Sequence, residues 1–228
     1  METRAVAKVT WAMQKIYVIG AGQTAQAIFD LIEDECLYEI AAIGLDQEFI
    51  NDAVHAKYPI IQIDEIPKKS KVFVAVGYKT LNAQRQALYE RVKQLGLETV
   101  NIISKNAIVR NTATLGKNVL IMEQNNVQAG TRVGTGTYLW SGNHLGHHTS
   151  IGRFNYISSH CVISGNCRIG DNNFIGVNTS IGDGLKIGSG CIVGQCAIIN
   201  QNVEDFSVLK TTGTEILTKS LRFNQRLL

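Results

Sequence analysis

Three histidines lie within five positions of the segment GNHLGHHTSIG, residues 142–152: His144, His147 and His148. The chain of 228 residues contains only five histidines in all. An imidazole that is neutral near pH 7 can take a proton from an attacking amine or hydroxyl, and it is also a common zinc ligand. The cluster therefore predicts either a catalytic base or a metal site.

These histidines lie within a repeat of six residues. An aliphatic residue recurs at every sixth position without interruption, and the residue two positions before it is usually small. A helix period of 3.6 or a strand period of 2 does not produce this spacing, whereas a prism of short strands joined by tight turns does. The aliphatic series is Ile103, Val109, Leu115, Ile121, Val127, Val133, Leu139, Leu145, Ile151, Ile157, Ile163, Ile169, Ile175, Ile181, Ile187, Val193 and Ile199.

Three hexads complete one turn of a triangular parallel β-helix, so residues 18 positions apart stack on one another. With Leu145 pointing inward, His147 and His148 project outward near a corner, and Gly165 stacks on His147. We expect small apolar residues, three cysteines among them, to fill the core. A second column is apolar and is expected to face outward, towards a neighbouring subunit or the acyl donor: Tyr138, Tyr156, Phe174 and Ile192.

The N-terminal half lacks the six-residue repeat and has alternating strand and helix patterns. KIYVIGAG, EIAAIGL and KVFVAVG are patterned as short buried strands, and QTAQAIFDLIEDE and TLNAQRQALYERVKQLG as helices, which predicts a small parallel α/β sheet. We divide the chain into an extension (1–13), a Rossmann-like domain (14–102), a β-helix (103–205) and a tail with a short helix (206–228).

A glycine turn follows the first strand of the N-terminal half. GAGQTA approximates the GxGxxA turn of dinucleotide-binding domains, whose backbone and helix N-terminus suit phosphate. We expect a sugar nucleotide to contact Gly20, Gly22, Gln23, Thr24, Asp46 and Tyr78. An NAD-dependent oxidoreductase is an alternative, but fewer than ninety residues do not supply both halves of a full dinucleotide-binding fold.

Composition narrows the class of partner. With 22 Lys and Arg against 19 Asp and Glu the net charge is +3, which lacks the concentrated basic face of a nucleic-acid-binding protein. No apolar run approaches the roughly 20 residues that a membrane-spanning helix needs. Five cysteines without a CxxC pair favour reduced thiols and a cytoplasmic location.

The repeats, clearest in IGDNNF, IGVNTS and LGHHTS, resemble those of the hexapeptide-repeat acyltransferases. Together with KIYVIGAGQTAQAIFD, they look more specifically like bacterial sugar acetyltransferases of the sialic-acid O-acetyltransferase and bacillosamine N-acetyltransferase type. This resemblance implies a left-handed β-helix, a homotrimer with active sites between subunits, and transfer of an acetyl group from acetyl-CoA to a sugar.

The resemblance also implies residue roles. His147 matches the catalytic base, and His148 stands where the family commonly has a glutamate. The N–H of Gly165 would meet the developing oxyanion. We expect acyl-CoA to contact Tyr156 and Gly194 as well as Gly165.

We therefore predict an acetyl-CoA-dependent N-acetyltransferase acting on a nucleotide-linked amino sugar, of the 4-amino-4,6-dideoxy kind, in lipopolysaccharide or capsule biosynthesis. O-acetylation of a sugar or sialic acid is one alternative, and a non-catalytic trimeric scaffold that binds a sugar nucleotide is another. A zinc site like that of the γ-type carbonic anhydrases is a third, but no histidine between His55 and His144 supplies the upstream ligand, so no metal is expected.

Overall fold

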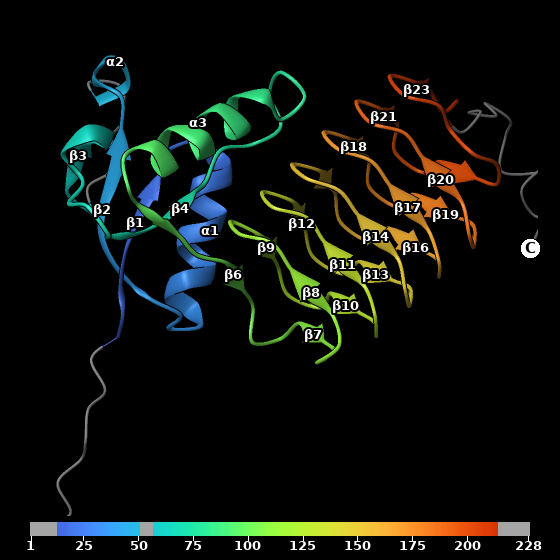
Figure 1. Ribbon diagram of the computed structural model, residues 1–228, viewed down its shortest axis with the longest axis horizontal. Helices are drawn as coiled ribbons and strands as arrows, with labels where there is room; N and C mark the ends of the chain where they lie inside the picture. The colour runs from blue at the N-terminus through green and yellow to red at the C-terminus, as the bar shows by residue number, and fades with distance from the viewer. Residues whose placement is uncertain (1–12, 51–56, 214–228) are drawn as a thin grey trace, which may run out of the picture.

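The computed structural model describes residues 13–50 and 57–213, which form a small α/β domain followed by a long prism of parallel strands (Figure 1). Twelve residues of the predicted extension, His55 and the predicted helix of the tail lie outside the described residues. No helix in the described ranges is long and apolar enough to cross a membrane.

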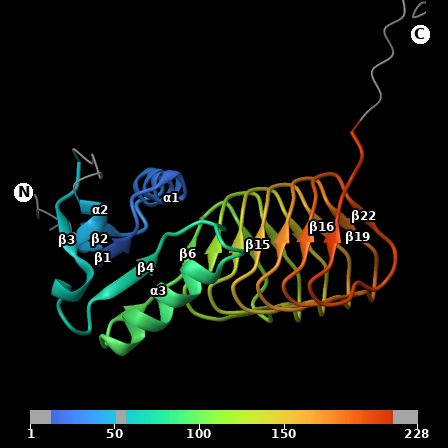
Figure 2. The ribbon, with the colours of Figure 1, turned by 90° about the horizontal axis from the view of Figure 1, so that it is seen from above.

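The N-terminal domain is a five-stranded parallel sheet in the order β3-β2-β1-β4-β5, which confirms the predicted sheet. Its two long helices lie on opposite faces of the sheet (Figure 2). The buried side chains of α1 share a hydrophobic cluster with one face of the sheet and with the prism, and α3 packs on the other face. In chain order the elements are β1 Lys15–Ile19, α1 Gln23–Asp34, β2 Glu39–Leu45, α2 Gln47–Ile50, β3 Ile60–Gln62, a 3₁₀ turn Ile63–Glu65, β4 Lys71–Val74, α3 Ala83–Gln94 and β5 Glu98–Thr99.

The prism has three faces, each a parallel sheet of two-residue strands. The first face contains β6 Ile102–Ile103, β9 Leu120–Ile121, β12 Tyr138–Leu139, β15 Tyr156–Ile157, β18 Phe174–Ile175, β21 Ile192–Val193 and β23 Val208–Leu209. The second contains β7 Ile108–Val109, β10 Asn126–Val127, β13 His144–Leu145, β16 Val162–Ile163, β19 Ser180–Ile181 and β22 Ile198–Ile199. The third contains β8 Thr114–Leu115, β11 Arg132–Val133, β14 Ser150–Ile151, β17 Arg168–Ile169 and β20 Lys186–Ile187.

The register of the prism is the predicted one, because residues 18 positions apart pair on every face, as Leu145 does with Ile163. The aliphatic series forms one core along the prism axis. Burying each such side chain contributes about 1.5–3 kcal/mol, which a prism of two-residue strands needs for stability. Cys161, Cys167 and Cys191 are buried free thiols in this core, and burial raises the pKa of Cys161 to about 11.

The aromatic column of the first face points out of the prism, as expected. The chain's own N-terminal domain covers Tyr138, Tyr156 and Phe174, whereas Ile192 stays exposed. Tyr138 is fully buried and stacks on Phe73 with the ring centroids 5.8 Å apart. The ring of Tyr78 lies 4.8 Å from that of Tyr156 and 4.7 Å from that of Phe174. The preceding domain folds back onto these rings, which removes their apolar area from water.

A buried arginine joins the two domains. Arg85 of α3 is completely buried and donates hydrogen bonds to the carbonyl oxygens of Gly136, Phe154 and Asn155 in the prism. It also donates to the carbonyls of residues 76 and 77, and its guanidinium lies 4.1 Å from the centroid of the Tyr138 ring. Burial lowers the pKa of Arg85 to about 10, so the side chain stays charged at neutral pH. These hydrogen bonds offset the free-energy cost of removing the charged guanidinium of Arg85 from water.

Candidate active site

The histidines lie on one edge of the prism, where the second face turns into the third. Three successive coils place a pair of residues in this turn: His147–His148, Gly165–Asn166 and Asp183–Gly184; we call these six residues the histidine corner. The second residue of each pair has a left-handed backbone, with φ of 58° at His148. The turn therefore points the side chain of the preceding residue out of the prism.

His147 and His148 form an imidazole pair. Their Nδ1 atoms are 3.2 Å apart, and the rings are inclined at 75°. Because a hydrogen bond needs one donor and one acceptor, one of the two Nδ1 atoms carries the proton. The backbone N–H of His147 donates to the side chain of Gln128 at 3.0 Å. The ring of His148 rests on Gly130, where an added Cβ would come within 2.8 Å of Cδ2.

Gly165 lies on the next coil, directly against the ring of His147. A Cβ at Gly165 would lie 2.9 Å from His147 Nε2 and 3.0 Å from Asp183 Oδ1. Gly165 is buried, and the absence of a side chain lets the His147 ring pack directly against its backbone. Within the described ranges, no backbone or side-chain acceptor is bonded to the Gly165 N–H, whereas the N–H of His147 in the coil before it is bonded to Gln128. A bare backbone, a free N–H and an imidazole nitrogen thus meet at one point.

The other histidines are placed apart from this pair. His144 is half-buried in strand β13 on the second face. His160 is at a different corner, between the first and second faces, with its ring over Gly142. In the part of the chain that the structure describes, no group of three His, Cys, Asp or Glu side chains is placed to hold a metal ion.

Two residues expected to contact acyl-CoA are not brought to the histidine corner of the same chain. Tyr156 is 7% exposed, because Tyr78 and Phe174 pack against its ring. Gly194 follows β21 at the corner between the first and second faces and packs beside Leu209. The repeat correctly predicts that the residues next to Tyr156 and Gly194 point inward. It does not predict that both residues lie away from the edge of the prism that carries His147.

A cavity of about 300 Å³ lies at the carboxyl ends of β1 and β2, where α/β domains bind ligands. Two of the predicted sugar-nucleotide residues, Gly20 and Asp46, line it. Residues that the sequence did not single out complete the wall: Ile19, Gly44, Leu45, Glu48, Phe49, Ile63, Gln84, Ala87, Leu88 and Arg91.

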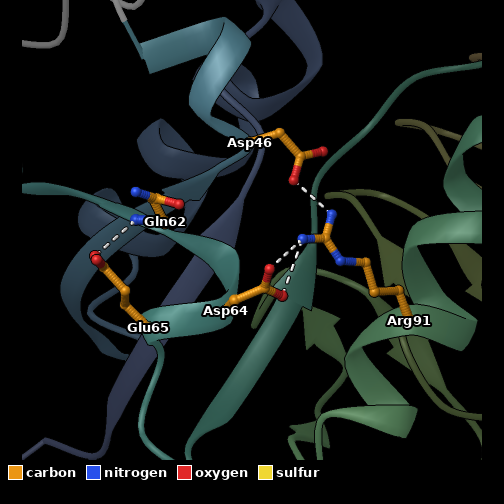
Figure 3. A network of polar contacts seen from close by, with 5 residues as sticks. All are labelled: Asp46, Gln62, Asp64, Glu65 and Arg91. Carbon is orange, nitrogen blue, oxygen red and sulfur yellow. Dashed lines mark hydrogen bonds and ion pairs between the residues drawn. The ribbon is translucent and has the colours of Figure 1, made fainter.

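Arg91 organises the polar side of this cavity (Figure 3). It donates to Asp46 and, at 2.9 Å, to both carboxylate oxygens of Asp64. The hydrogen bond that Arg91 donates to Asp46 is the main reason why the pKa of Arg91 is raised. Since the partners lie 45 and 27 positions away in sequence, no local pattern predicts this network.

The other predicted sugar-nucleotide residues do not line the cavity. Gly22 precedes α1, and Gln23 and Thr24 begin that helix, with Gly22 and Gln23 exposed to solvent. Tyr78 is half exposed and covers the aromatic column. The glycine turn therefore presents the N-terminus of α1 on the same end of the sheet as the cavity.

Comparison with known proteins supports the expectations from sequence. Residues 15–92 match the family described as PglD N-terminal domain, and residues 166–201 match the family described as bacterial transferase hexapeptide (six repeats). No curated protein sequence matches the chain.

Among solved structures, the acetyltransferase domain of PglB from Neisseria gonorrhoeae FA1090, in complex with acetyl coenzyme A, is 25% identical, with a TM-score of 0.77 over 86% of this chain and 96% of that one. PerB from Caulobacter crescentus, in complex with CoA and GDP-perosamine, is 23% identical, with a TM-score of 0.78 over 88% and 95%. WeeI from Acinetobacter baumannii AYE is 17% identical, with a TM-score of 0.70 over 86% and 97%. The left-handed β-helix and the resemblance to hexapeptide-repeat sugar acetyltransferases are confirmed.

Proposed function

We propose that this chain, which combines hexapeptide repeats with a PglD-type N-terminal domain, is an acetyl-CoA-dependent N-acetyltransferase. Its acceptor is the amino group of a nucleotide-linked amino sugar, of the 4-amino-4,6-dideoxy kind, in bacterial surface glycan biosynthesis. The enzyme works in the cytoplasm, where its five free cysteines stay reduced.

The observation that carries the proposal is the position of His147 over Gly165. Its ring packs against the bare backbone of Gly165, whose N–H has no acceptor among the described residues. An acyl transfer to an amine needs a proton acceptor and a donor for the developing oxyanion at the same carbonyl. The likeness to the PglB acetyltransferase domain over most of both chains supports acetyl-CoA as the donor.

In this proposal His148 takes the role of the family's glutamate. If the Nδ1–H of His147 donates to Nδ1 of His148, Nε2 of His147 is left as the unprotonated acceptor. The sugar amine gives a proton to Nε2 as it attacks the thioester carbonyl, and the carbonyl oxygen accepts from the Gly165 N–H. Collapse expels the CoA thiolate, which takes that proton back from His147.

The lining of the N-terminal cavity supports binding of the nucleotide part of the acceptor sugar there. Its wall is largely apolar and includes the half-exposed ring of Phe49, a surface on which a base can stack. Gly22 and the N-terminus of α1 present N–H groups suited to a diphosphate. Asp46 keeps one carboxylate oxygen free of Arg91 for a hydroxyl or base N–H.

We propose a homotrimer with active sites between subunits. The second face, which carries His144, exposes Ile108 (53%), Val162 (45%) and Ile198 (83%). No described element of the chain covers these side chains, and burial against another copy would remove them from water. A molecular mass of three chains by light scattering is the expected result.

The test is thiol release from acetyl-CoA with UDP-, GDP- and dTDP-linked 4-amino-4,6-dideoxy sugars and with free sialic acid. We expect release with one of the amino sugars. Release with sialic acid alone would instead make the enzyme an O-acetyltransferase. If the protein binds a nucleotide sugar but releases no thiol from acetyl-CoA with any acceptor, it is a non-catalytic scaffold.

A further inference from the structure

Asp183 and His147 both approach the backbone of Gly165 in the histidine corner. Its Oδ1 lies 3.0 Å from the position of a Cβ at Gly165, and His147 Nε2 lies 2.9 Å from the same position. Within the described residues, no hydrogen bond or ion pair joins the two atoms. Both atoms therefore lie close to the same point of the Gly165 backbone without contacting each other.

Aspartates at the equivalent turn position elsewhere in the prism have a structural role that Asp183 does not have. Asp171 accepts the backbone N–H of Arg153, 18 residues earlier, at 2.7 Å. Asp205 accepts that of Ser189, also at 2.7 Å. Within the described residues, Asp183 makes no such bond to the Gly165 N–H. Its carboxylate is exposed and free of any ion pair with a described residue.

We infer that Asp183 binds the amino group of the acceptor and makes the site select an amine over a hydroxyl. This inference rests on the proposed function and names a residue for it. An aliphatic amine enters largely as an ammonium ion, whose N–H groups a carboxylate accepts more strongly than a neutral group does. A sugar hydroxyl has no positive charge and a single hydrogen to share between Asp183 and His147.

The protons balance in this scheme. The ammonium nitrogen contacts both Asp183 Oδ1 and His147 Nε2. One proton passes to solvent before attack. A second passes to His147 as the nitrogen bonds to the carbonyl carbon, while the carbon–sulfur bond breaks. The second proton then leaves with the thiol, so the products are an amide, CoA–SH and one free proton. Asp183 takes no part in these proton transfers and keeps the nitrogen near the Gly165 backbone.

The decisive variant is Asp183→Asn, because an amide keeps the size and an oxygen acceptor but has no charge. Thiol release is measured with the UDP-, GDP- and dTDP-linked 4-amino-4,6-dideoxy sugars and with the same sugars carrying a 4-hydroxyl. For the amino sugar that the wild type uses, we expect kcat/KM to fall on the order of 10- to 100-fold. KM for acetyl-CoA should stay within about twofold, and any rate with the hydroxyl sugar should not fall. Glu204→Gln, which removes one charge near the far end of the prism, is the matched control and should be unchanged.

Full activity of Asp183→Asn with the amino sugar would overturn the inference while the proposed function stands. A rise in KM for acetyl-CoA without a loss of amine selectivity would overturn it too, since Asp183 would then contact the donor. A wild-type protein that releases no thiol with any amino sugar would overturn both the inference and the proposed function.

Discussion

His147 Nε2 and the backbone of Gly165 face each other across one coil of the β-helix, although they are 18 positions apart in sequence. The six-residue repeat brings them together, and the absence of a side chain at Gly165 lets the imidazole pack against the backbone. Reactive groups held by adjacent coils have little freedom to move apart, because each coil is bonded to the next along every face. The arrangement is preorganised for a reaction at one point.

Replacing His147 with alanine removes the proposed base. We expect turnover to fall on the order of 10²- to 10⁴-fold, because general base catalysis contributes that much. CoA affinity, measured by calorimetry, should change little, since His147 acts on the amine. The matched control is His160→Ala, which removes an exposed histidine from a different corner. Full turnover in His147→Ala would disprove the assignment.

Replacing His148 tests whether the imidazole pair fixes the tautomer of His147. His148→Ala should lower kcat about tenfold through loss of one hydrogen bond, with KM for the sugar nearly unchanged. His148→Glu should restore most of the activity, because a carboxylate also accepts from the Nδ1–H. If glutamate is no better than alanine at this position, His148 does not orient His147.

Gly165→Ala should inactivate the enzyme without unfolding it. The new Cβ would come within 3.0 Å of both polar atoms and displace His147. A misplacement of about 1 Å can cost on the order of 10²-fold in rate. Gly182→Ala is the control, because its Cβ would meet nothing closer than 3.4 Å. Rates and thermal unfolding should be measured together, and equal rates for the two variants would contradict the prediction.

Asp46→Ala should weaken binding of the nucleotide sugar about tenfold, through loss of an acceptor in the cavity wall. Asp64→Ala is a matched control, because Asp64 shares Arg91 but does not line the cavity. Calorimetry should find its affinity within about twofold of the wild type. Equal losses in the two variants would show that Arg91, and not Asp46, matters for binding.

Arg85→Met should reduce the free energy of unfolding by about 2–4 kcal/mol, because buried carbonyls on both domains lose their donor. Gln94→Met, at the exposed end of α3, should change it by less than about 0.5 kcal/mol. Urea unfolding measures both. A loss below 1 kcal/mol in Arg85→Met would mean that water replaces the guanidinium at little cost.

The six-residue period by itself determined the prism, its inward series and the stacking of Gly165 on His147. This was possible because each strand of a β-helix pairs with the strand 18 residues away, so local spacing sets long-range register. The strand and helix patterns of the first half similarly predicted the parallel sheet, although α2, β3 and β5 are too short to leave a clear pattern.

Tertiary structure alone decided which surfaces the two domains share. The repeat predicts that the aromatic column points out of the prism, but only the folded chain shows that Tyr78 and Phe73 of the N-terminal domain cover it. Asp183 drew no attention in sequence, because its proximity to His147 depends on the direction of two side chains across two coils. The partners of Arg91 lie on other elements of the sheet. A periodic sequence specifies backbone register, whereas the contacts of side chains between domains depend on how the domains pack.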